Sequence, residues 1–123
     1  LDTWLGHVRN SRSEKVDEAS AALAGRLLAH LTTLRSMSVA VTARLVAGET
    51  PMTEASLVKD LGTEFEQLIP VAVADVLASS AEPVTPELLR TLAYITQFAP
   101  TFSLRGGTRE VLRGLIARGL GLR

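Results

Sequence analysis

Cysteine is absent from this 123-residue chain, which excludes disulfide bonds and metal sites built on thiolates. Aromatic residues are also scarce, at 4% of the chain, whereas Leu and Ala are abundant. Because strands draw on β-branched and aromatic residues, this composition favours a helical core over a sheet. The lack of cysteine fits a reducing cytoplasm, where we expect the protein to act.

Neither sign of charge is in excess, since Lys plus Arg and Asp plus Glu both number 13. A nucleic-acid-binding domain needs surplus basic residues to displace counterions from phosphates, so no nucleic-acid partner is expected. Charged residues interrupt every apolar run before it could span a bilayer, so no membrane partner is expected either. The start, LDTWLGHVRN, lacks a signal-peptide pattern and begins with Leu, and we expect the chain to continue from an upstream segment.

The length and a hydrophobic fraction of 46% predict one globular domain over residues 1–123. Apolar residues recur at helical spacing, and no strict alternation competes with it. We expect the end of a helix at 1–10, a polar break at 11–15, a loop at 99–107, and helices over about 14–47, 51–79, 86–98 and 108–119. The simplest fold is all-α, an antiparallel four-helix up-and-down bundle with two long and two short members.

Each long helix is expected to bury one apolar stripe. Gly48 is placed to stop the first helix, Thr50 and Pro51 to start the second, and Pro70 to kink it. The expected stripes are Leu23, Leu27, Leu31, Leu34, Val41 and Leu45 in the first helix, and Leu57, Leu61, Phe65, Leu68 or Ile69, Ala72 and Val76 in the second.

Residues that could carry chemistry are few. His7 and His30 are the only histidines, and neither lies in a Glu-x-x-His pair of the kind that holds iron in helical bundles, so no metal site is expected. No Gly-x-Ser-x-Gly elbow is present, although composition alone does not exclude a Ser-His-Asp triad. A charged set is expected to face solvent with weak ion pairs: Lys59, Asp60, Glu64 and Glu66.

The closing segment, SLRGGTREVLRGLIARGLGLR, places two glycines and a capping Thr108 before the last helix. Four arginines surround that helix: Arg105, Arg109, Arg113 and Arg118. They fit a solvated face, a subunit contact, or an anion-binding edge aided by the helix amino terminus. On physical grounds plain capping is favoured, and a phosphate-facing site comes second.

This segment resembles the end of acyl-CoA dehydrogenases, where Glu-Gly-Thr-Ser-Glu-Ile-Gln-Arg-x-x-Ile-Ala-Arg is typical. The matching positions are Gly107, Thr108, Glu110, Val111, Arg113, Ile116, Ala117 and Arg118. The stretch LRSMSVAVTARLVAGETPMTEASLVKDLGTEFEQ is similar to the two long antiparallel helices of the same family, including its Gly-x-x-Pro turn and Ser-x-x-Lys. The resemblance covers nearly the whole chain and implies the C-terminal helical domain of a longer protein.

The resemblance implies an FAD-dependent enzyme that oxidises the Cα–Cβ bond of an acyl-CoA thioester in fatty-acid or sterol side-chain oxidation. In that family a base removes the α-proton, and a hydride passes to the flavin, which lies between subunits of a dimer or tetramer. Thr108 and Glu110 match positions that touch FAD, and Arg109 lies between them. Gly106 and Gly107 match positions beside the substrate. The implied partners are homo- or hetero-oligomeric acyl-CoA dehydrogenase subunits and an electron-transfer flavoprotein.

Gly106 departs from the family pattern, because it stands where many members carry the catalytic glutamate and glycine cannot accept a proton. Arg105 likewise replaces the usual aromatic residue, and the family's Gln-x-x-Gly-Gly and Arg-x-x-Phe-Gly elements are missing. No catalytic residue is therefore expected in this segment. An upstream helix supplies the base, or a partner subunit does, as in heteromeric actinobacterial members, and the combined losses favour the second.

Alone, the segment is expected to be inactive and to serve in oligomer assembly and as a wall for FAD near residues 108–110. Apolar helix faces left open by missing domains are expected to drive the assembly. The rival interpretation is a non-enzymatic helical interaction module, in which the glycine loop is a helix cap only.

Overall fold

The computed structural model describes residues 1–10 and 17–122 of the chain. Within these ranges the elements are α1 (Asp2–Asn10), α2 (Glu18–Val46), α3 (Met52–Ser79), α4 (Pro86–Phe98), the 3-10 helix η1 (Ala99–Leu104) and α5 (Arg109–Gly119). The described residues contain no strand, which confirms the all-α class. The expected polar break at 11–15 and the helix start near residue 14 lie outside the described residues.

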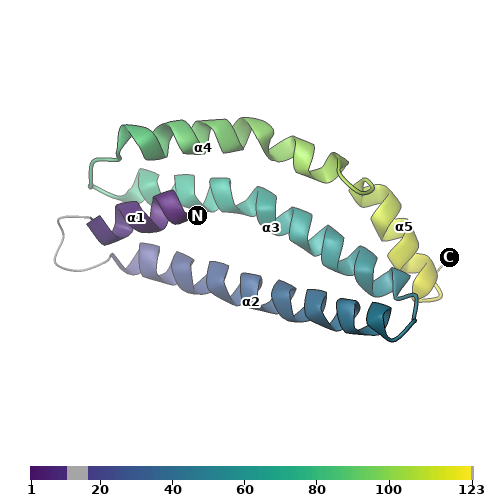
Figure 1. Cartoon of the computed structure of the whole chain (residues 1–123). Helices are drawn as coiled ribbons and strands as arrows, with labels where there is room; N and C mark the ends of the chain where they lie inside the picture. The colour runs from purple at the N-terminus through teal and green to yellow at the C-terminus, as the bar shows by residue number, and fades with distance from the viewer. Residues whose placement is uncertain (11–16, 123) are drawn as a thin grey trace.

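Helix α3 is the central rod of the fold, with α2 antiparallel along one side of it (Figure 1). Another side of α3 is covered in series by α4, η1 and α5. Gly119 approaches Thr53 at the start of α3, whereas Gln67 donates to the carbonyl of Ala99 over 3.0 Å, so this series also runs antiparallel to α3. The four-helix up-and-down arrangement is not confirmed, because α4 and α5 follow one another and α1 adds a short helix beside α4.

The hairpin of α2 and α3 is defined by its ends. Asp17 caps α2 by accepting from the Ser20 amide at 2.8 Å and from the Ser20 hydroxyl at 2.6 Å. At the far end Gly48 has a φ of 82°, the left-handed conformation in which a helix commonly stops. Arg44, on the last turn of α2, reaches across this turn. It pairs with Glu49 at 2.7 Å and also contacts Glu54 on the first turn of α3. The two long helices are therefore held antiparallel through a short connection.

The apolar core lies at the end where α1, the start of α2, the end of α3 and the start of α4 meet. Its buried members are Trp4, Leu23, Leu27, Phe65, Val73, Val76 and Leu88. Four of them belong to the expected stripes. The prediction is wrong for four leucines that are exposed, Leu31 at 49%, Leu45 at 55%, Leu57 at 37% and Leu61 at 37%. Helix α2 is packed mainly against α3, and among the described residues several large apolar side chains of α2 are exposed.

In the described part of the chain, no helix is long and apolar enough to cross a membrane.

Candidate functional site

A polar stripe runs along the face of α3 that meets α5. Ser56, Asp60 and Thr63 are buried there, with 5%, 6% and 1% of their surface exposed. Spacings of four and three residues put them on one side of the helix. Ser56 donates its hydroxyl to the Met52 carbonyl at 2.7 Å, and Thr63 accepts from Nζ of Lys59 at 2.9 Å. These two side chains are satisfied within α3, whereas Asp60 finds its partners on α5.

Asp60 receives two arginines from α5. Nε of Arg109 donates to Oδ1 over 3.0 Å, and Nε of Arg113 donates to Oδ2 over 3.2 Å. Arg109 and Arg113 are four residues apart, so both reach the same carboxylate from one face of α5. Each carboxylate oxygen thus accepts one charge-assisted hydrogen bond. The contact joins α3 to α5 through Asp60 and Arg109, which are 49 residues apart in the sequence.

These arginines determine the protonation of Asp60. Burial raises the pKa of the carboxyl, but the hydrogen bonds and positive charges of Arg109 and Arg113 outweigh it, so the pKa lies below its ordinary value. A carboxylate with a lowered pKa and both oxygens engaged is a poor proton acceptor. Asp60 is therefore a structural anion rather than a general base.

Further ion pairs surround this contact. Nη2 of Arg109 lies 2.9 Å from Oε1 of Glu64. The geometry of this contact is not that of a hydrogen bond, and Nη2 has no hydrogen-bond acceptor among the described residues. We take the short distance as a charge contact. Arg105 reaches Glu66 at 3.4 Å, with both side chains largely exposed. Four ion pairs thus connect α3 to α5 and to the loop before it.

The expectation that these acidic residues all face solvent is wrong for Asp60, although it fits the side chains of Glu64 and Glu66, which are 56% and 48% exposed. The sequence held a signal for the pairing. Acids at 60 and 64 and arginines at 109 and 113 share a spacing of four. Complementary charges at matched helical spacing on two helices indicate an interhelical contact.

The two glycines before α5 both have left-handed backbone, with φ of 70° at Gly106 and 104° at Gly107. A Cβ at Gly106 would lie 3.5 Å from the flexible end of Lys59, and one at Gly107 would lie 3.4 Å from Leu112 Cδ2. Leu112 is buried, so the loop leads directly into packed structure. Glycine is required here for the backbone conformation more than for space.

Thr108 is the N-cap of α5 by backbone conformation, but its side chain makes no capping hydrogen bond, so the predicted side-chain cap is wrong. Its carbonyl accepts from the Leu112 amide at 3.0 Å. The neighbouring Glu110 is exposed, and its pKa is lowered, first by its own backbone amide and then by the Thr108 hydroxyl. Glu110 is thus held as an anion at the amino end of α5, where the helix dipole favours it.

The five predicted site residues are contiguous, and among the described residues the distant charged groups that reach them are the end of Lys59, beside Gly106, and the carboxylates that pair with Arg109. Gly106 and Glu110 are exposed, and Gly107 and Thr108 are half-buried. The Arg109 side chain is 23% exposed and turns inward to α3. The cationic set therefore splits, because Arg109 and Arg113 are engaged by the buried Asp60, whereas Arg105 pairs with the exposed Glu66 and lies over the Phe102 ring.

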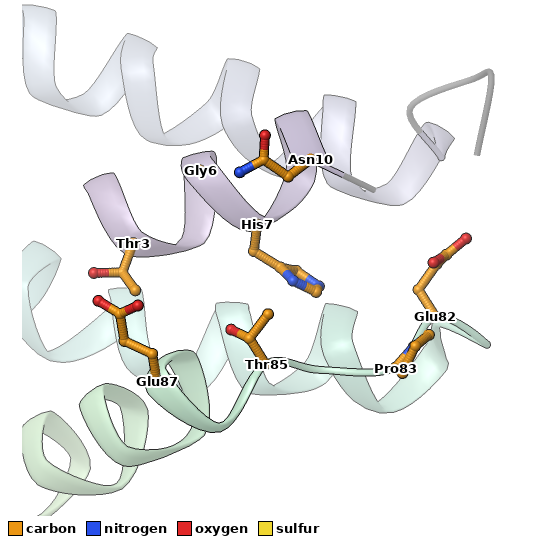
Figure 2. A pocket seen from close by; sticks show the side chains of 8 residues that line it. All are labelled: Thr3, Gly6, His7, Asn10, Glu82, Pro83, Thr85 and Glu87. Atoms are coloured by element: carbon orange, nitrogen blue, oxygen red, sulfur yellow. The ribbon is translucent and has the colours of Figure 1, made fainter. Parts of the chain in front are cut away.

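Hollows lie between the helices of the described structure, and one of about 320 Å³ between α2 and α3 is lined in part by Lys59, Thr63 and Glu66. The hollow drawn in Figure 2, of about 840 Å³, lies between α1 and the segment that enters α4, where Thr3 faces Glu87 and His7 points toward Pro83 and Thr85. Another, of about 640 Å³, lies between α2 and α3 and includes His30 and Phe65, whose rings are 5.5 Å apart. His7 and His30 thus belong to separate hollows. The described residues contain no group of His, Asp and Glu side chains suited to a metal ion.

No family model, no curated protein and no solved structure matches this chain.

Proposed function

We propose that this chain is the C-terminal helical domain of a cytoplasmic, FAD-dependent acyl-CoA dehydrogenase. The assignment rests on the sequence resemblance, and two features of the fold support it. Helices α2 and α3 are long, antiparallel and joined by a short turn. The Gly106–Gly107 loop then leads into α5 at the end of the chain. In this proposal the helices correspond to the family's bundle, and α1 to the end of its preceding part.

The observation that carries the proposal is the backbone of the glycine loop. Gly106 and Gly107 both take conformations that residues with side chains rarely adopt, and neither adds a side chain of its own to the surface of the loop. In the proposed enzyme, the two glycines border the acyl thioester. Thr108 and Glu110 contact the flavin, with Arg109 behind them against α3.

The proposed domain supplies no catalytic base. Gly106 has no side chain, and Asp60, the buried carboxylate nearest the start of α5, is engaged by two arginines. The base therefore comes from a preceding helix or from a partner subunit, and the missing family elements favour the partner. The flavin supplies the redox chemistry by accepting a hydride when bound.

An assembly role has support in the surface of α2. Large apolar residues stand exposed along this helix: Leu28 at 64%, Leu31 at 49%, Val39 at 60%, Leu45 at 55% and Val46 at 84%. Apolar surface of this extent on one helix is typical of a contact with another polypeptide. We assign this surface to packing against other domains or subunits of a dimeric or tetrameric dehydrogenase. The electron acceptor of the proposed enzyme is an electron-transfer flavoprotein.

The proposal is tested by producing the complete gene product that contains this domain, with its candidate partner subunit, and measuring flavin by absorbance and by release of FAD. We expect a yellow protein with bound FAD. A colourless product that does not take up added FAD contradicts the assignment.

The second candidate is a non-enzymatic helical interaction module, which the exposed surface of α2 also favours. In that case the glycine loop serves only to enter α5. The two functions are separated by the same purification, because a module binds its protein partner without flavin.

A further inference from the structure

We propose that Asp60 is a positioning residue that fixes the glycine loop, defined here as residues 105–108, through its hold on Arg109 and Arg113. The Asp60 side chain is only 8% exposed, and each of its oxygens accepts from a different arginine. The arginines are one turn apart on α5, so together they fix the rotation of α5 and its height along α3. Because the loop joins α5 at Arg109, its position follows from theirs.

The other contacts of the loop are weak, including Arg105 over the Phe102 ring, with 5.0 Å from the guanidinium carbon to the ring centroid. The loop's own ion pair, Arg105 with Glu66, spans 3.4 Å between side chains that are 64% and 48% exposed, and such pairs contribute little. Gly106 faces only the flexible end of Lys59, and two consecutive glycines have the greatest backbone freedom of any residues. The buried anchors nearest to the loop are thus Asp60, through Arg109, and Leu112.

The contact also determines which groups the loop presents outward. Asp60 and Glu64 turn the Arg109 guanidinium toward α3, so Thr108 and Glu110 form the outer surface at the start of α5. This consequence rests on the proposed function, in which that surface faces the flavin. Asp60, which touches neither ligand in the proposal, then acts on the flavin site only through Arg109 and Arg113.

The test is residue-resolved amide hydrogen exchange on the 123-residue chain, comparing wild type with Asp60→Asn. Glu66→Gln is the matched control, because it removes a carboxylate charge from an exposed pair with the same loop, six residues further along α3. We expect Asp60→Asn to accelerate exchange at residues 106–112 by at least about tenfold, which lies between the effects of losing an exposed and a fully buried ion-pair partner. Exchange in the core, at Leu23 and Phe65, should accelerate less than exchange at residues 106–112.

A uniform acceleration through α2 and α3 would identify Asp60 as a general stabilising residue and overturn the positioning role. Unchanged exchange at 106–112 would overturn it too. If Asp60→Asn does not fold, Arg109→Gln provides the second variant and should loosen the same segment while Arg113 keeps Asp60 paired.

A second readout separates this inference from the proposed function. In the complete flavoprotein, Asp60→Asn should shift the flavin absorbance spectrum or lower FAD retention, whereas Glu66→Gln should do neither. If the complete protein binds no flavin, the proposed function fails, and the exchange measurement still decides the role of Asp60. If flavin binds but Asp60→Asn leaves both its spectrum and its retention unchanged, the positioning role fails while the proposed function stands.

Discussion

Asp60 on α3 and Arg109 on α5 are joined by a 3.0 Å hydrogen bond across 49 residues of sequence, with the carboxylate buried and the guanidinium mostly so. This contact, with Arg113 on the other oxygen, links the central rod of the fold to its last helix. The charges of the closing segment are therefore partly used within the domain, and an anion-binding edge formed by all four arginines is not available.

Replacing Asp60 should destabilise the fold more than replacing its exposed neighbour. Asp60→Ala leaves Arg109 and Arg113 without their shared anion, and we expect a loss of about 2 kcal/mol in the free energy of unfolding, between the values for exposed and fully buried pairs. Glu66→Ala should cost less than about 0.5 kcal/mol, because both partners reach water. Urea denaturation of the two variants measures the difference, and equal losses would contradict it.

The stability of the chain should fall in acid, partly because of Asp60. Its pKa is lower in the folded chain than when unfolded, so the unfolded state binds more protons as the pH falls. The contribution is present above the unfolded pKa, near pH 4, and is lost as the pH falls through the folded pKa. Asp60→Asn should flatten this acid limb in thermal melts taken from pH 6 to pH 2, whereas an unchanged limb would exclude Asp60 as its source.

The two glycines of α5 should respond oppositely to alanine. A Cβ at Gly119 would lie 2.9 Å from the Thr53 Cβ, so Gly119→Ala should push α5 from α3 at a cost of about 1–3 kcal/mol. At Gly114 a Cβ meets nothing within 4 Å, and Gly114→Ala should stabilise the helix by roughly 0.5–1 kcal/mol. Thermal denaturation of the pair checks this, and stabilisation by both would show that the close approach of α5 to Thr53 does not form.

The exposed side of α2 should mediate association. Leu28→Gln with Val39→Gln removes two side chains that are 64% and 60% exposed, and we expect lower self-association at unchanged helicity. Leu89→Gln on α4, where the side chain is 51% exposed, is the control for a scattered surface leucine. Sedimentation velocity with circular dichroism measures both. Association that persists in the double variant would place the contact elsewhere.

Helix positions were predictable because their signals are local. The sequence predicts a helix over 86–98 from Thr85 and Pro86, and α4 has these bounds, with Thr85 Oγ1 accepting from the Leu88 amide at 3.3 Å. Gly48 likewise predicted the stop after α2. The stretch expected as a loop at 99–107 instead begins as η1, Ala99–Leu104, where the Gln67 side chain binds the Ala99 carbonyl. That contact is long-range, so no local pattern announces it.

The burial of side chains was harder to predict, because it depends on which faces of the helices pack against one another. Leu31 and Asp60 show the two kinds of error. The apolar periodicity of α2 predicts that Leu31 is buried, but its side chain is 49% exposed, because the described helices do not cover it. A charged residue in a charged stretch predicts exposure for Asp60, and only the pairing of α3 with α5 makes it a buried anchor.

The most direct test of the central claim, that this is the flavin-facing helical domain of an acyl-CoA dehydrogenase without its own base, is anaerobic titration of the complete protein, with its partner subunit, with acyl-CoA thioesters. The account predicts that the flavin absorbance bleaches, while the isolated 123-residue chain with added FAD, as wild type or Gly106→Glu, gives no reduction. Flavin reduction by the isolated wild-type chain, or a complete protein whose flavin no acyl-CoA reduces, would contradict it.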